Sequence, residues 1–133
     1  MIVVDTSALI AILDKEPDAV LFAEAIAEAD TPLISAATLL ELHIVMLNRH
    51  GAMAAQLVDR LIQTAAFQIE NFTAQHVEIA REAYARYGKG RDAAGLNYGD
   101  CFAYALAKAT GLPLLFKGQD FSMTDLVAAL PNT

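Results

Sequence analysis

Four short apolar runs, separated by longer segments with helical periodicity, constrain the fold of this chain more than any other feature. The runs are "IVVD" (2–5), "TPLIS" (31–35), "FQIE" (67–70) and "LPLLF" (112–116). Strands that alternate with helices pair in parallel and place the helices on both faces of the sheet. The sequence therefore predicts an α/β fold, a three-layer α/β/α sandwich with a short, mainly parallel sheet. The sheet has four strands, or five if the tail "LVAALPNT" adds an edge strand.

Capping residues and helix breakers set the expected helix limits. We expect helices over "SALIAILDKE" with Thr6 or Ser7 as the cap, over "DAVLFAEAIAEA" with Pro17 in its first turn, from Ser35 to Gly51, over 52–66, over 74–87 with Thr73 as the cap, and from Asn97 to Lys108. The segment "GKGRDAAGLNYGD" is rich in glycine and basic residues, which predicts a loop.

The composition limits the class of protein. The 133 residues are 56% hydrophobic and 19% charged, which predicts a single globular domain over 1–133 with a surface covered by self-association or by a partner. A lone cysteine, Cys101, fits a reducing compartment, and "MIVVD" lacks the basic start of a signal peptide. We therefore expect a cytoplasmic protein without a membrane span. The net charge of −7 argues against a protein that wraps duplex DNA.

Four acidic residues stand in places that a structural role explains poorly. Asp5 ends the first predicted strand, and Asp120 follows shortly after the fourth. Asp100 lies in the first turn of the helix that Asn97 caps, and Glu41 lies among apolar helical neighbours. Because the carboxyl ends of parallel strands share one edge of the sheet, we expect these four side chains to converge there.

Carboxylates gathered in one pocket repel one another and take up protons unless a cation neutralises them. An all-oxygen set favours Mg²⁺ or Mn²⁺, and no histidine stands in a zinc-binding pattern. Each strand-end or helix-start acid also has a structural explanation: Asp5 as a helix cap, Asp100 as an acid favoured by the helix dipole, Asp120 as a turn residue. Asp125 is a reserve candidate for the site, and Cys101 is expected in the core.

Four stretches that run through the whole chain carry a resemblance. They are "VVDTSALIAIL", "SAATLLEL", "LNYGDCFAYALAKATGLPLLFKGQDF" and "TDL". Through them the sequence resembles the PIN domains, and more narrowly the VapC-type toxins of bacterial toxin–antitoxin pairs. The resemblance implies a metal-dependent endoribonuclease that forms a homodimer and is inhibited by a VapB-type antitoxin. One departure is "GQD" where close relatives often have "GND", which leaves the acid in place.

The resemblance also assigns roles to individual positions. The acidic quartet of the family, which is catalytic and binds the metal, matches Asp5, Glu41, Asp100 and Asp120. Thr6 or Ser7 matches the hydroxyl position beside the first acid, and Thr124 matches the polar position after the last.

The expected mechanism is hydrolysis of an RNA phosphodiester by an activated water. Asp5 and Asp100 are expected to be the main ligands of Mg²⁺ or Mn²⁺. Glu41 and Asp120 are expected to hold water or a second ion, and one of them to accept the proton. The basic residues predicted to contact phosphates of single-stranded or loop RNA are Lys89, Arg91 and Lys117.

Two other functions compete with this interpretation. A receiver domain or a haloacid-dehalogenase-type phosphatase also places acids at strand ends, but Thr6 and Ser7 stand where those folds need further acids. The remaining alternative is a dimeric scaffold without catalytic activity.

Overall fold

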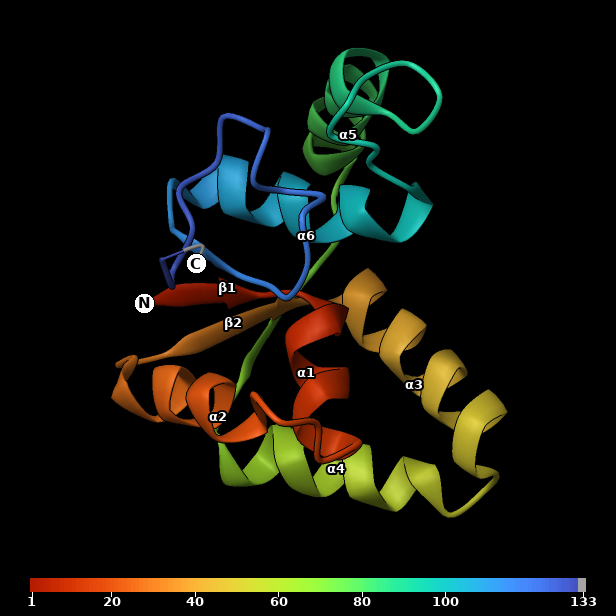
Figure 1. The fold of residues 1–133 in the computed structure, drawn as a ribbon, viewed down its shortest axis with the longest axis vertical. Coiled ribbons are helices and arrows are strands. Elements are labelled where there is room, and N and C mark those ends of the chain that lie inside the picture. The colour runs from red at the N-terminus through yellow and green to blue at the C-terminus, as the bar shows by residue number, and fades with distance from the viewer. Residues whose placement is uncertain (132–133) are drawn as a thin grey trace.

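A parallel sheet lies between two layers of helices in the computed structural model, which describes residues 1–131 (Figure 1). The strands are β1 (Ile2–Val4), β2 (Pro32–Ser35), β3 (Gln68–Glu70) and β4 (Leu114–Leu115). Their order in the sheet is β3-β2-β1-β4, and every neighbouring pair is parallel. The predicted α/β class and the parallel sheet are therefore confirmed.

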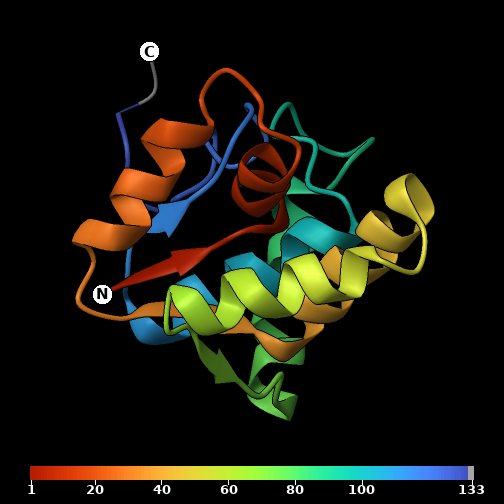
Figure 2. The same ribbon diagram turned by 90° about the horizontal axis from the view of Figure 1, so that it is seen from below.

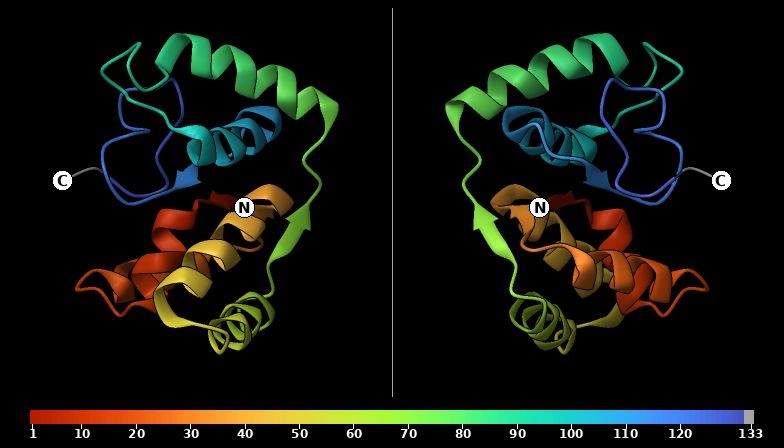
Figure 3. Two further views of the ribbon diagram at one scale, coloured as in Figure 1. Left: turned by 90° about the vertical axis from the view of Figure 1, so that its right-hand side faces the viewer. Right: turned by 90° about the vertical axis from the view of Figure 1, so that its left-hand side faces the viewer.

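The helices fall into two layers. They are α1 (Thr6–Leu13), α2 (Ala19–Glu28), α3 (Ala36–His50), α4 (Ala54–Thr64), α5 (Ala74–Tyr87) and α6 (Tyr98–Thr110). Helix α6 packs on the sheet with α5 outside it, whereas α1 to α4 cover the opposite face (Figure 3). Figure 2 views that second layer from below, with α4 in the foreground. None of the helices in residues 1–131 is both long enough and apolar enough to cross a membrane.

The strands are apolar throughout because both faces of the sheet are buried. Successive side chains point to opposite layers. Val3 and Leu114 pack with α5 and α6, whereas Val4 and Leu115 pack with α1 to α4. All four side chains are fully buried, and each burial contributes about 1.5–3 kcal/mol.

Local capping positions α6, which carries one of the predicted acids. The Asn97 side chain accepts a hydrogen bond from the Asp100 N–H at 2.9 Å, and the Asp100 carboxylate accepts one from the Asn97 N–H at 3.0 Å. This reciprocal pair fixes the first turn. Gly111 ends the helix in the left-handed conformation, with φ of 71°, as glycine does at many helix ends.

Several predicted limits were wrong by a few residues. Helix α2 begins at Ala19, because Pro17 belongs to the turn before it, in which the Ala19 N–H donates to the Glu16 carbonyl at 2.9 Å. Helix α4 is shorter at both ends than predicted, covering Ala54–Thr64. The tail forms a single parallel bridge between Ala128 and Leu114, not a fifth strand, in the part of the chain that is described; residues 132–133 of that predicted strand lie outside it.

The predicted cap of α1 was also wrong. Asp5, not Thr6 or Ser7, is the N-cap, and its side chain accepts the Ser7 N–H at 3.0 Å. A capping side chain reaches the N–H two or three residues ahead of it, so the strand-end acid occupies the capping position itself.

Candidate active site

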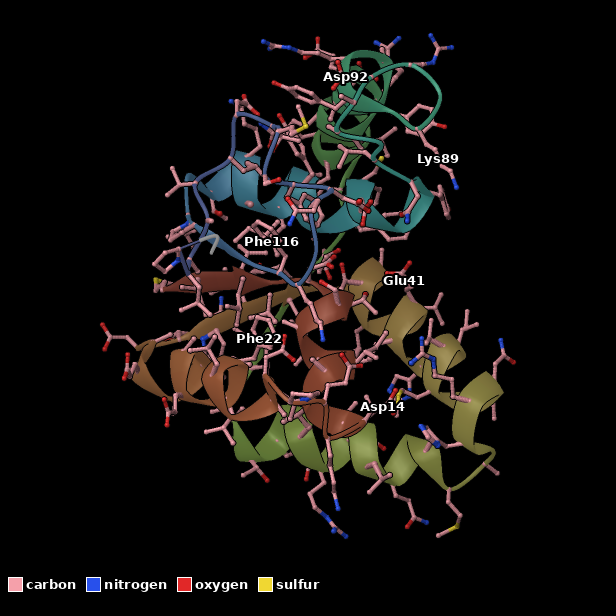
Figure 4. The ribbon with its side chains drawn as sticks, in the orientation of Figure 1. Asp14, Phe22, Glu41, Lys89, Asp92 and Phe116 are labelled. Carbon is pink, nitrogen blue, oxygen red and sulfur yellow. The ribbon has the colours of Figure 1, made fainter. Side chains whose placement is uncertain are left out.

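One pocket at the carboxyl edge of the sheet is lined by all four predicted acids. The pocket has a volume of about 260 Å³, and its polar lining consists of Asp5, Thr6, Ser7, Glu41, Arg49, Asn97, Asp100, Lys117 and Asp120. In Figure 4, Glu41 lies at the end of α3 that faces α6. The acids come from the end of β1, from α3, from the first turn of α6 and from the loop after β4, so only the folded chain brings them together.

Asp5 is the deepest of the four acids and is only 4% exposed. One of its oxygens accepts hydrogen bonds from the Ser7 N–H at 3.0 Å and the Ser7 hydroxyl at 2.6 Å. The Ser7 hydroxyl oxygen in turn accepts the Lys117 N–H at 2.9 Å, which ties the loop after β4 to the start of α1. Burial raises the pKa of Asp5 from an ordinary 3.8 to about 6; the Ser7 hydrogen bonds oppose this rise, and the charge of Glu41 adds to it.

Asp100 has the most perturbed carboxyl of the pocket. Burial is the largest cause that raises its pKa from 3.8 to about 8. The hydrogen bond from the Asn97 N–H lowers the pKa, whereas hydrogen bonding with Asp120 and the charges of Asp5 and Asp120 raise it further. Asp5, Asp100 and Asp120 line the same pocket, and carboxylates that share a site repel one another.

Glu41 lies on α3, and its carboxylate contacts the first turn of α1. Its Oε1 atom accepts a hydrogen bond from the Thr6 hydroxyl at 2.6 Å. Thr6 and Ser7 therefore each hold one acid of the pocket, Glu41 and Asp5 respectively. Asp120 is exposed and lies at the mouth of the same pocket.

Other predicted residues lie outside this lining. The Thr124 hydroxyl donates to the Phe121 carbonyl at 2.7 Å within the loop after β4. Asp125 accepts hydrogen bonds from the Tyr104 hydroxyl and the Lys108 ammonium, both at 2.6 Å, and therefore has a structural role at a different pocket.

The predicted RNA-contacting cations differ in position. Lys89, labelled in Figure 4, and Arg91 are exposed on the loop between α5 and α6. Neither lines the acid pocket. Lys117 does line it, and its ammonium forms ion pairs with Glu16 and Asp18. Cys101 is buried, as predicted, and burial raises the pKa of its thiol to about 11, so it is no ready nucleophile.

Arg49 is the residue of this pocket that sequence reasoning missed. It lies on α3 eight residues after Glu41 and lines the pocket with Val45 between them. Residues spaced by four lie on one face of a helix, so that spacing from Glu41 was the available signal. The guanidinium of Arg49 pairs with Asp14 at 2.7 Å and is half exposed.

The oxygen atoms that line the pocket are ligands of the kind that hard divalent cations prefer. The groups of the lining that can bind a metal are carboxylate, hydroxyl and amide oxygens, without sulfur or imidazole, and the cations Arg49 and Lys117 stand beside them. Such oxygen sets favour Mg²⁺ or Mn²⁺. Residues 1–131 do not present three His, Cys, Asp or Glu side chains already arranged around a common point. Asp5 and Glu41 each use one carboxylate oxygen to accept a hydroxyl hydrogen bond, from Ser7 and Thr6 respectively.

The PIN domain family profile matches residues 2–126 of this chain. The chain belongs to the PIN domain family. Among curated relatives of this PIN domain, ribonuclease VapC of Mycolicibacterium smegmatis is 49% identical over 126 residues, which are 95% of this chain and 98% of the relative. Ribonuclease VapC30 of Mycobacterium tuberculosis is 50% identical over 131 residues, covering 97% and 99% of the two chains.

Solved structures share the fold of this PIN domain. VapC20 of Mycobacterium tuberculosis, described as a toxin that cleaves the sarcin-ricin loop, superposes with a TM-score of 0.80 at 22% identity, over 98% of this chain and all of that one. VapBC2 of Rickettsia felis, bound to a DNA fragment of its promoter, superposes with a TM-score of 0.76 at 18% identity, over 96% of each chain.

The crowded acids predict how the metal-free PIN domain responds to pH. Asp5 and Asp100 keep their protons in the folded state up to about pH 6 and about pH 8, whereas in the unfolded chain both lose them near 3.8. The folded state thus binds more protons in this window, and its stability falls as the pH rises. In EDTA, the unfolding temperature should therefore fall between pH 5 and pH 8. The double variant Asp5→Asn, Asp100→Asn should lose most of this slope; an equally steep slope in that variant would assign it to other groups.

Proposed function

We propose that this PIN domain is a Mg²⁺- or Mn²⁺-dependent endoribonuclease and the toxin of a type II toxin–antitoxin pair in the cytoplasm. The observation that carries the proposal is the single pocket lined by Asp5, Glu41, Asp100 and Asp120. Curated relatives that are 49% and 50% identical to this chain are named ribonucleases, which supports the proposal. The substrate is single-stranded or loop RNA, because an open pocket at a sheet edge admits a splayed strand more readily than a duplex.

The acids of the pocket would have different roles in hydrolysis. A bound Mg²⁺ or Mn²⁺ supplies charge neutralisation at phosphorus and lowers the pKa of an attacking water. Asp5 and Asp100 would hold the ion, since they are the acids whose pKa values burial and mutual repulsion raise. Glu41 and Asp120 would hold metal-bound water or a second ion, and one of them would accept the proton of the attacking water.

The hydroxyls and one backbone group keep these acids in place. Thr6 fixes Glu41 through the 2.6 Å hydrogen bond, and Ser7 fixes Asp5 while accepting the Lys117 N–H. Catalytic groups need such support, because small displacements of a reacting group cost much of the rate.

Incubation of the purified protein with Mn²⁺ and a pool of structured RNAs tests this function. We expect discrete cuts in loops and single-stranded segments, found by mapping the new RNA ends, and little cutting within duplexes. Intact RNA would leave the non-catalytic scaffold as the better interpretation. Transfer of label from a phosphoryl donor to the protein would favour the receiver-type alternative.

Arg49 is the further cation that we propose for RNA binding at this pocket, beside the predicted Lys89, Arg91 and Lys117. An RNA strand that enters a pocket with four acids needs positive charge close to its phosphates. Arg49 and Lys117 are the basic side chains of the lining. The Lys117 ammonium pairs with two carboxylates, those of Glu16 and Asp18. Arg49 pairs with one carboxylate, that of Asp14, which also pairs with His50.

Removal of Arg49 should weaken RNA binding in a salt-dependent way. In the Asp100→Asn background, which prevents cutting, Arg49→Ala should reduce the slope of log affinity against log salt by about 0.7, the value for one contact to a single strand. The matched change Arg60→Ala removes an exposed arginine of α4 and should leave the slope unchanged. Asp14→Asn breaks the same ion pair but keeps the guanidinium, so it should not weaken binding. Equal losses in Arg49→Ala and Asp14→Asn would show that only the ion pair matters.

We also propose a homodimer and a VapB-type antitoxin as partners. Helix α3 carries Leu40, Ile44 and Leu47 on one face, each at least half exposed, which supports contact with a second copy. An apolar groove of about 450 Å³ between α2 and α4 has the character of a site for an amphipathic partner helix. The VapBC2 structure from Rickettsia felis, which shares the fold, supports an antitoxin partner.

A further inference from the structure

The Glu41 carboxylate lies directly against the backbone of Gly99. A Cβ atom built on Gly99 would stand 1.7 Å from Glu41 Oε2, 2.5 Å from Cδ and 2.9 Å from Oε1. These are the three nearest atoms, and all of them belong to the same carboxylate. No side chain larger than hydrogen therefore fits at position 99 while Glu41 keeps its place.

Backbone conformation does not explain this glycine. The glycines with positive φ in residues 1–131 are Gly51, Gly90, Gly95, Gly111 and Gly118, so Gly99 has a backbone that any residue adopts. It is the second residue of α6, with Asn97 as the cap. Alanine is favoured over glycine within helices. The Glu41 carboxylate is thus the neighbour that a side chain at position 99 would displace.

The same carboxylate also contacts α1, because the Thr6 hydroxyl donates to Oε1 at 2.6 Å. Glu41 is therefore held between the first turn of α1 and the first turn of α6. The latter turn also carries Asp100, the residue next to Gly99. A side chain at position 99 would push the Glu41 carboxylate away from this turn.

We propose that Gly99 is a positioning residue, whose missing side chain admits the Glu41 carboxylate to the first turn of α6. The catalytic consequence rests on the proposed function, but the packing claim does not. Gly99 acts through Glu41 alone, so the effect of a substitution at position 99 depends on what stands at position 41.

A double-mutant cycle measured by thermal unfolding in EDTA tests the packing claim without activity. Glu41→Ala removes the carboxylate, and Gly99→Ala should then raise the unfolding temperature, because alanine improves the helix. With Glu41 present, Gly99→Ala should lower the unfolding temperature or leave it unchanged. As a matched control, Gly99→Ala in a Glu70→Ala background should behave as it does in the native protein, because Glu70 ends β3 and does not line the pocket. The same shift in all backgrounds would overturn the proposal.

Titration with Mn²⁺ tests the consequence for the site. Gly99→Ala should weaken Mn²⁺ binding at least about tenfold, and the shorter acid of Glu41→Asp should remove most of this effect, so that Gly99→Ala changes little in that background. Unchanged Mn²⁺ affinity in Gly99→Ala would overturn the positioning role.

RNA cleavage separates this proposal from the proposed function. If the native protein cuts no RNA while the unfolding cycle shows the expected reversal, the nuclease function fails and the positioning of Glu41 stands. If the native protein and Gly99→Ala cut RNA at equal rates, the nuclease function stands and the positioning role fails.

Discussion

Asp100→Asn should abolish RNA cleavage, with a loss of at least about 10³-fold in rate, while the protein remains folded. Asparagine has nearly the same shape as aspartate but lacks the negative charge that a divalent ion needs. Its carbonyl oxygen can still accept the Asn97 N–H, which the carboxylate accepts at 3.0 Å. The capping of α6 should therefore survive, and the lost activity should be chemical in origin.

The stability of this variant distinguishes a functional acid from a structural one. Because burial and the neighbouring acids raise the pKa of Asp100 to about 8, the carboxyl is unfavourable in its charged form without a metal. In EDTA at pH 8, the unfolding temperature of Asp100→Asn should equal or exceed that of the native protein. Unfolding of the variant would refute the assignment of Asp100 to the metal site. Glu70→Gln, a carboxyl change at the same edge of the sheet but outside the pocket, should retain cleavage.

Removal of divalent metal should stop cleavage altogether. Four carboxylates in one pocket of about 260 Å³ repel both each other and the RNA phosphates unless a cation intervenes. Treatment with EDTA should reduce the rate to that of the buffer alone, and addition of Mn²⁺ or Mg²⁺ in excess should restore it.

A gel assay that measures cleavage of one RNA with and without EDTA tests this prediction. The dialysed protein should recover full activity when the metal is returned. Cleavage that continues unchanged in EDTA would rule out the metal-dependent mechanism and would point to acid–base chemistry by the side chains alone.

Much of the fold was predictable because its signals are local. The apolar strands are buried on both faces, so they appear in the sequence as continuous runs without polar alternation. Thr73 and Asn97 cap their helices as predicted, and Gly111 closes α6. The limits of α2 and α4 were less predictable, because Pro17 fits a preceding turn as well as a first helical turn.

The acids of the site and the hydroxyls of Thr6 and Ser7 were predictable, whereas Arg49 and Gly99 were not. Asp5, Asp100 and Asp120 follow strands or begin a helix, and parallel topology places such positions at one edge. Glu41 stood out as an acid among apolar neighbours. The contribution of Gly99 depends on its contact with Glu41, far from it in the chain, which no local pattern records. For Arg49 the only local signal was its spacing from Glu41 on α3.

Asp5 shows why a structural and a functional explanation need not exclude each other. It is the N-cap of α1 and also the most buried acid of the pocket. Its capping hydrogen bonds use one oxygen, Oδ2, which accepts both Ser7 donors. Its other oxygen makes neither of these bonds, so the helix cap can orient a ligand.

Calorimetric titration of the metal-free protein with Mn²⁺ tests the central claim most directly, because the claim is that distant acids form one cation site. The native protein and Glu70→Gln should bind Mn²⁺ with the same affinity, and Asp5→Asn and Asp100→Asn should each lose most of that binding while remaining folded. Absence of binding by the native protein, or equal binding by all four proteins, would contradict the account.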